Sequence, residues 1–198
     1  MAPRRQHRRA AQSGTPYPEA LAAFGERVRL VGPDRWASPT PCSDWSVRDL
    51  VNHLTAEQLW VPELLTGATI AEVGDRFDGD VLGADPVAAW SAAAGAARQA
   101  WEVPGAAGLT VHLSFGDVSG QYYLDQLTTD LVVHAWDLTE GIGARTRLPP
   151  DLVDFALEKI SGYGDLSGSG VFDPPLPAPE GAGPQTRLLA LTGRRDTG

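Results

Sequence analysis

The chain contains very little cysteine, methionine or lysine. Its 198 residues include one Cys, Cys42, one Met, and a single lysine, Lys159. One thiol excludes an internal disulfide, and a reducing, cytoplasmic compartment is the location that we expect.

Long apolar runs are also absent. No stretch approaches the roughly 20 apolar residues that a membrane-spanning helix requires, so we expect no membrane partner. The first ten residues hold four arginines and no acid, and removing these four charges from the net charge of -9 leaves -13 for the rest. Because phosphate contacts require clustered Lys and Arg, this acidic body argues against nucleic acid as a partner.

Apolar periodicity predicts four principal helices and a shorter fifth. The second has the clearest start, because Ser46 is a good N-cap and Asp49 three residues later completes a capping box. The third opens at Asp85-Pro86, a cap followed by the proline that favours a first helical turn. The expected helices cover residues 17–31, 47 to about 65, 86–101, about 119–139 and 150–160.

The predicted helices indicate an all-α fold, and the remaining segments add two irregular parts to it. Residues 109–115 alternate apolar and polar side chains, which favours a short extended segment or hairpin. Residues 161–184 are rich in Gly, Pro and Ser and predict irregular coil, after which the apolar residues 186–191 could dock on the bundle. We expect residues 1–15 to form a disordered basic tail and residues 16–195 a single domain built as a four-helix bundle.

Two histidines fall on the apolar faces of two of these helices. At about 100° per residue, His53 lies within the apolar arc of the second helix, and Glu57 lies one turn after it. His134 lies within the arc of the fourth helix, with Asp130 at its edge one turn before. Burying such groups is costly unless they are paired, and a divalent metal would pair with all of them. The pattern therefore predicts a metal site of His53, Asp130 and His134 with open positions, as in catalytic sites.

Simpler interpretations of the same residues stay open. Each histidine could be a core residue held by a hydrogen bond, and Asp130 could merely orient His134. Glu57 is a candidate general base or fourth ligand, but a salt bridge to an arginine would explain it equally well. We expect Asp137 to be solvated or a hydrogen-bond partner rather than a ligand, and Cys42 to be an inert thiol. Neither His112 nor His7 is expected to bind metal.

Two segments resemble a known family. Residues 40–54, TPCSDWSVRDLVNHL, resemble the segment T-P-C-x-D-W-x-V-x-x-L-x-x-H of the DinB-like superfamily. Residues 130–138, DLVVHAWDL, resemble the second signature, D/E-x-x-x-H-x-W-D-L, of its actinobacterial metal-binding group. That group is related to the N-terminal domain of mycothiol-dependent maleylpyruvate isomerase. The closing residues 187–194 are also similar, so the resemblance covers most of residues 17–195.

The resemblance implies a DinB-type four-helix bundle and a metal held by His53, Asp130 and His134. It implies zinc, with nickel or another first-row metal as alternatives, binding a small thiol such as mycothiol as thiolate. Asp130 stands where the isomerase has Glu and is shorter by one methylene. The chain also lacks the length of the isomerase's full second domain.

The function that we expect is therefore a thiol-dependent transferase or isomerase acting on an electrophilic small molecule. Two alternatives remain: a non-catalytic metal-binding or scaffold protein, and a metal-dependent hydrolase with Glu57 as base. A homodimer is a further expectation, because bundles with exposed Trp often associate.

Overall fold

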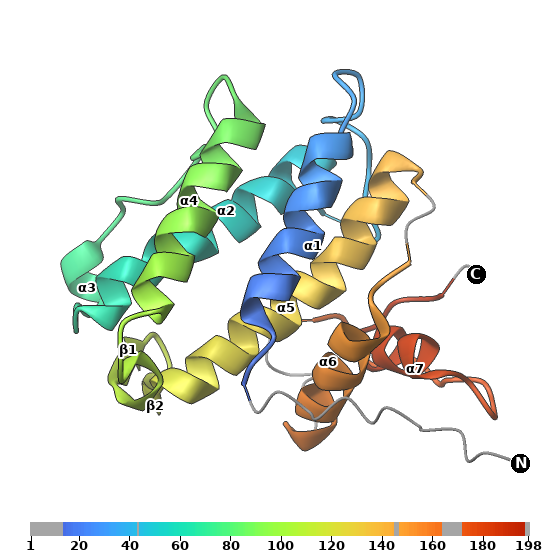
Figure 1. Ribbon diagram of the computed structural model, residues 1–198. Coiled ribbons are helices and arrows are strands. Elements are labelled where there is room, and N and C mark those ends of the chain that lie inside the picture. Colours follow the sequence, from blue (N-terminus) through green and yellow to red (C-terminus); the bar gives the residue numbers. More distant parts are fainter. Residues whose placement is uncertain (1–13, 43, 145–146, 164–171, 197–198) are drawn as a thin grey trace, which may run out of the picture.

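Four long helices, α1, α2, α4 and α5, make up the body of the structure (Figure 1). The computed structural model describes residues 14–42, 44–144, 147–163 and 172–196. The helices are α1 (Tyr17–Leu30), α2 (Val47–Leu65), α3 (Ile70–Val73), α4 (Pro86–Trp101), the 3-10 turn η1 (Ala106–Gly108), α5 (Gly120–Ile142), α6 (Pro150–Gly162) and α7 (Pro184–Leu191). Strands β1 (Thr110–Leu113) and β2 (Gly116–Ser119) form a hairpin between α4 and α5.

Helix α5 is the centre of the packing. It lies against α1, α2 and α6, while α2 also packs against α4, so the core lies between these helices. Because neighbours cover α5 on several sides, the whole stretch from Leu131 to Thr139 is buried. Side chains on this stretch are therefore removed from water even where they are polar.

The start of α2 has the predicted capping box. The backbone nitrogen of Asp49 donates to Oγ of Ser46 at 3.3 Å, and the backbone nitrogen of Ser46 donates to the Asp49 carboxylate at 2.9 Å. These reciprocal bonds satisfy backbone groups that the first turn leaves free. The capping box fixes the start of α2 and therefore the position of His53, two turns further along.

The hairpin is longer than the extended segment that the sequence predicts. Thr110 pairs with Ser119 and Leu113 with Gly116 in an antiparallel register. Ser119 is the N-cap of α5, because its hydroxyl accepts from the backbone nitrogen of Tyr122 at 3.2 Å. Helix α5 also continues past the predicted end at Thr139 to Ile142, and Gly143 closes it in the left-handed conformation with a φ of 68°.

The C-terminal part is irregular where the structure describes it. Residues 172–183 form no helix or strand, as predicted. The apolar residues near 186–191 belong to helix α7. The short elements α3 and η1 were not predicted. Most of the expected basic tail, residues 1–13, lies outside the described residues, so that prediction stays untested.

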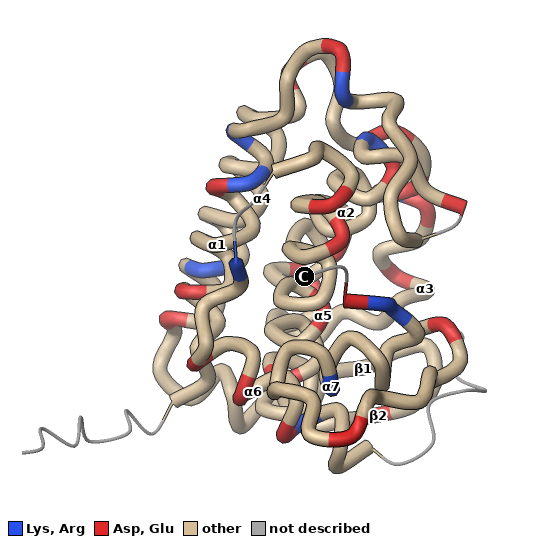
Figure 2. Tube along the Cα trace, turned by 90° about the vertical axis from the view of Figure 1, so that its right-hand side faces the viewer, with Lys and Arg blue, Asp and Glu red and all other residues tan. Residues whose placement is uncertain are grey.

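Acidic residues outnumber basic ones, and both are spread over the structure. Figure 2 shows Asp and Glu spread along the helices, with Lys and Arg scattered singly among them. Among the described helices, none combines the length and apolar character that crossing a bilayer would require.

Candidate metal centre

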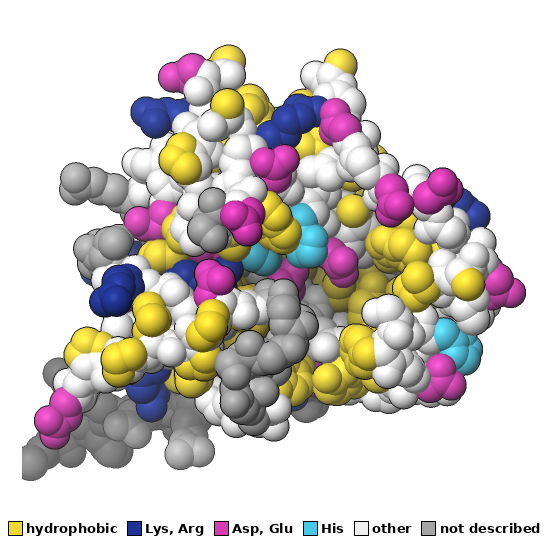
Figure 3. Space-filling view, turned by 180° about the vertical axis from the view of Figure 1, so that it is seen from behind, with side chains coloured by type: hydrophobic (Ala, Val, Ile, Leu, Met, Phe, Trp, Pro, Cys, Tyr) yellow, Lys and Arg dark blue, Asp and Glu magenta, His cyan; other side chains and the backbone are white. Residues whose placement is uncertain are grey.

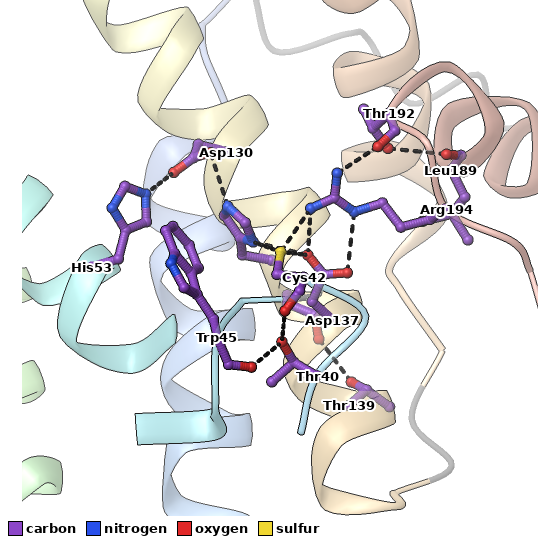
Figure 4. Close-up of polar contacts among 12 residues, drawn as sticks. Thr40, Cys42, Trp45, His53, Asp130, Asp137, Thr139, Leu189, Thr192 and Arg194 are labelled. Carbon is purple, nitrogen blue, oxygen red and sulfur yellow. Dashed lines mark hydrogen bonds and ion pairs between the residues drawn. The ribbon is translucent and has the colours of Figure 1, made fainter. Parts of the chain in front are cut away.

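The two histidines predicted to bind one metal ion lie on α2 and α5, which pack against each other. Figure 4 shows His53 directed toward Asp130 of α5. The ring centroids of the two histidines are 5.6 Å apart. The carboxylate of Asp130 lies between them, with Oδ2 3.4 Å from Nε2 of His53 and Oδ1 3.3 Å from Nε2 of His134. The structure therefore brings all three predicted residues together.

The donor atoms of this trio suit a divalent metal. One nitrogen from each imidazole and one oxygen of Asp130 lie within 4.8 Å of one another. Two imidazoles and a carboxylate are ligands of zinc, nickel and other first-row metals, and three protein ligands leave positions open. His134 is almost fully buried, while the side chains of His53 and Asp130 are 31% and 18% exposed, so the trio is open on one side.

The charges of the trio are strongly coupled. Burial raises the pKa of Asp130, but the adjacent imidazoles of His134 and His53 outweigh burial and hold that pKa well below its ordinary value. Burial lowers the pKa of His134, but Asp130, Asp137 and Cys42 outweigh it, and the net pKa is raised. Without a metal, His134 therefore holds a proton in an ion pair with Asp130. A metal ion would have to displace that proton.

A second layer of groups fixes His134 from behind. Its Nδ1 lies 2.8 Å from Oδ2 of Asp137, which is fully buried. Arg194 donates to both oxygens of Asp137, from Nε at 3.2 Å and from Nη2 at 2.9 Å. Arg194 follows α7 and is itself only 5% exposed, so this bidentate ion pair ties the C-terminal segment to α5.

The thiol of Cys42 belongs to this second layer. Its Sγ donates to Oδ2 of Asp137 at 3.3 Å, and Nη2 of Arg194 approaches the sulfur at 3.0 Å. Cys42, His134 and Asp137 could by spacing form another metal group. The guanidinium of Arg194 already supplies the positive charge there, so His53, Asp130 and His134 are the better candidate site.

Trp45 packs against both histidines. Its ring centroid is 4.7 Å from that of His53 and 5.7 Å from that of His134. The loop before α2 positions it, because the Thr40 hydroxyl donates to the carbonyl oxygen of Trp45 at 2.9 Å. The indole therefore contacts both imidazoles and lines the same cavity.

A cavity of about 710 Å³ opens from the trio. His53, Asp130 and His134 line one part of it, and Glu57 lines it one turn after His53. Figure 3 shows imidazoles on this face of the molecule, between acidic and hydrophobic side chains. Among the described residues Glu57 forms no salt bridge with an arginine, so the salt-bridge alternative has no support from that part of the chain. Burial raises the pKa of Glu57, and His53 only partly offsets it.

The other histidines do not contribute to the site. His112 lies on β1 and pairs with Asp117 of β2 at 2.7 Å, in the hairpin. His7 lies outside the described residues.

The sequence left the role of Asp137 open between two possibilities and did not indicate Arg194. Of the two roles expected for Asp137, a solvated residue or a hydrogen-bond partner, the structure shows the second. The Asp137 side chain is fully buried. Its position three residues after His134 was the available signal, because residues at that spacing share a helix face. Arg194 was not predicted in this role, because no local pattern links it to a residue 57 positions earlier.

Comparisons with known proteins give the family. A family model described as the mycothiol maleylpyruvate isomerase N-terminal domain matches residues 17–139. Two uncharacterized proteins of Mycobacterium tuberculosis, from strains CDC 1551 and H37Rv, are each 33% identical to the chain over 181 residues. The matched region covers 88% of this chain and 93% of each relative.

A solved structure shows the same fold. The chain resembles the crystal structure of a histidine-to-alanine mutant of the mycothiol-dependent maleylpyruvate isomerase, with a TM-score of 0.56 and 14% sequence identity. The similarity covers 73% of this chain and 66% of that one, so the chain spans about two thirds of that enzyme. Since the family model covers more than half of the chain, the protein belongs to the mycothiol maleylpyruvate isomerase N-terminal domain family.

Proposed function

We propose that this protein is a metal-dependent enzyme that activates a small thiol, mycothiol or a similar one, for reaction with an electrophilic substrate. The observation that supports this most directly is the convergence of His53, Asp130 and His134 on the wall of a 710 Å³ cavity. Membership in a mycothiol-related family supports the thiol as co-substrate.

His53, Asp130 and His134 would hold the metal, and zinc is the ion that we favour for two imidazoles and a carboxylate. A bound divalent cation would place positive charge beside the thiol sulfur and so lower the pKa of the thiol. Asp137 would keep Nδ1 of His134 protonated through the bond at 2.8 Å, which leaves Nε2 directed to the trio. Arg194 would hold Asp137 in place.

Glu57 is the group that we assign to proton transfer. Its raised pKa brings the carboxylate closer to the range in which a general base works near neutral pH. In a transfer reaction Glu57 takes the proton from the thiol sulfur. The sulfur electron pair then forms a bond to the electrophilic carbon, and the leaving group departs with the electrons of the bond that breaks.

Calorimetric titration with zinc tests the ligand set. The metal-free protein should bind one zinc ion. His134→Ala should lower the zinc affinity at least about a hundredfold, because the ion would then have only two protein ligands. His112→Ala is the matched control, since this histidine also pairs with an aspartate but lies in the hairpin. Equal zinc affinity in the wild type and His134→Ala would refute the proposed site.

Thiol dependence tests the reaction class. Zinc-loaded protein is incubated with 4-nitrophenyl acetate, with and without mycothiol, and release of nitrophenolate is compared with that of His134→Ala. Release that requires mycothiol supports the proposal. Release without thiol would indicate a metal hydrolase with Glu57 as base, and no release above the variant would indicate a binding protein.

A further inference from the structure

The cavity wall beyond the trio is mostly apolar and aromatic. Trp60 and Leu64 of α2 face it, together with Phe115 of the hairpin and Phe172 of the C-terminal segment. Trp60 stacks edge-on against Phe77, with ring centroids 5.5 Å apart. Such a surface favours an apolar ligand with aromatic character, because burial and offset ring contacts both contribute.

Among the described residues the wall has no unpaired positive side chain, since the imidazoles of His53 and His134 already contact the carboxylates of Asp130 and Asp137. The described residues that line the cavity include the acids Glu57 and Asp130 but no Lys or Arg. Cations on neighbouring elements are engaged elsewhere. Arg76 pairs with Glu63 at 2.6 Å, Lys159 pairs with Asp125 at 2.9 Å, and Arg194 pairs with Asp137. A ligand carboxylate placed among the apolar side chains would therefore be buried without a protein partner, which is costly.

Among the described residues, three that line the cavity have a hydroxyl group without a hydrogen-bond partner: Tyr123, Thr129 and Tyr163. Tyr123 and Thr129 of α5 are 4% and 2% exposed, and both line the cavity. Their hydroxyl oxygens have no hydrogen-bond partner among the described residues. Burial raises the pKa of Tyr123, so its hydroxyl stays protonated and remains a donor. Unpaired buried donors are unusual, and a ligand oxygen that accepts from them would remove the penalty.

We infer that the cavity binds an uncharged substrate with an apolar, aromatic body and an accepting oxygen, rather than a carboxylate such as the maleylpyruvate in the family's name. The inference rests on the proposed function in one respect, since this substrate would be the electrophile. It concerns the cavity wall and not the metal trio. Tyr123 is then a specificity-determining residue.

Benzophenone and 4-benzoylbenzoate are the matched probes. Both have two aromatic rings and a ketone oxygen, and only the second carries a carboxylate. Binding is measured by calorimetry on the metal-free protein in excess EDTA without thiol, so failure of the metal or thiol proposal does not affect the result. We expect benzophenone to bind at least about tenfold more tightly. Equal or tighter binding of 4-benzoylbenzoate, or no binding of benzophenone, would overturn the inference.

Two variants test which residues decide the preference. Gln126 of α5 also lines the cavity, so Gln126→Arg should strengthen binding of 4-benzoylbenzoate about tenfold or more over Gln126→Leu. Tyr123→Phe removes only the unpaired hydroxyl and should weaken benzophenone binding about three- to tenfold. Irradiating bound benzophenone should crosslink it to peptides that line the cavity. Crosslinks confined to other surfaces, or an unchanged affinity in Tyr123→Phe, would contradict the assignment.

Discussion

Oδ2 of Asp137 lies 2.8 Å from Nδ1 of His134, three residues earlier on α5. Burial raises the pKa of Asp137, but His134 and Arg194 outweigh it and hold the pKa below its ordinary value. An ionised carboxylate can only accept, so Nδ1 must carry the proton. This assignment leaves Nε2 as the atom that faces Asp130, and as the only nitrogen of His134 available to a metal at the trio.

Asp137→Asn should therefore weaken zinc binding about 10- to 100-fold, because the amide no longer supplies the charge that orients His134 and makes it a stronger ligand. Calorimetric titration with zinc measures this effect. Asp117→Asn is the matched control, since Asp117 contacts His112 at 2.7 Å in the hairpin and should leave the affinity unchanged. If Asp137→Asn binds zinc as tightly as the wild type, Asp137 does not position His134.

Replacing Arg194 should destabilise the protein through the carboxylate that it leaves behind. Arg194→Met keeps the volume but removes the guanidinium partner of the buried Asp137 carboxylate, which then keeps only its contacts with His134 and Cys42. We expect a loss of about 3 kcal/mol in the free energy of unfolding. Urea denaturation of the metal-free protein measures this loss. Arg48→Met is the control, because Arg48 forms an exposed pair with Asp80 and should cost about 1 kcal/mol or less. Equal losses in the two variants would contradict the prediction.

Glu57 should make stability depend on pH in a defined direction. Its pKa is raised above 4.5 in the folded protein, so between that value and the folded pKa the folded state binds more protons than the unfolded state. The free energy of unfolding must then fall as pH rises through this window. Glu57→Gln cannot ionise, so its stability relative to the wild type should increase with pH above 4.5.

Urea denaturation of metal-free protein from about pH 4 to pH 7 checks this difference, since an ordinary Glu titrates at the lower end of that range. Glu102→Gln serves as the control, because the Glu102 side chain is 60% exposed. It should differ from the wild type by less than about 0.5 kcal/mol at each pH. If the stability of Glu57→Gln relative to the wild type falls as pH rises, the predicted direction is wrong.

Two glycines should respond to alanine in opposite directions. A Cβ on Gly120 would lie 2.4 Å from the carbonyl oxygen of Ala106 in η1, so backbone would have to move. We expect Gly120→Ala to cost about 1–3 kcal/mol. Gly95, within α4, has nothing within 4 Å of the added Cβ, so Gly95→Ala should stabilise by about 0.5–1 kcal/mol. Thermal denaturation of both variants measures the contrast, and a stabilising Gly120→Ala would show that α5 need not approach η1 so closely.

Local patterns predicted the helices well because caps and apolar periodicity act over a few residues. The bounds of α2 matched at both ends, since Ser46 and Asp49 define its start and Gly67 follows its end. The end of α5 was placed three residues early, at Thr139 instead of Ile142, although Gly143 has the left-handed conformation expected of a closing glycine.

Projection onto helical faces also brought His53, Asp130 and His134 into one interior, because each side chain's direction follows from its place on a helix. What it could not give were contacts that depend on the tertiary path. The burial of Asp137 follows from how many elements cover α5, and its pairing with Arg194 joins segments 57 residues apart. The cavity likewise requires the hairpin and the C-terminal segment to be placed in space.

The long separation between Asp137 and Arg194 has a consequence for biosynthesis. Helix α5 leaves the ribosome before Arg194 has been translated, so in the nascent chain the Asp137 carboxylate has no guanidinium to pair with. Until that cation arrives, burying Asp137 is unfavourable, and the imidazole of His134 lacks its fixed neighbour. The site can therefore reach its final geometry only after the C-terminal segment has been synthesised. A nascent chain stalled before codon 194 would contain both histidines, but the Asp137 carboxylate that orients His134 would lack its arginine partner.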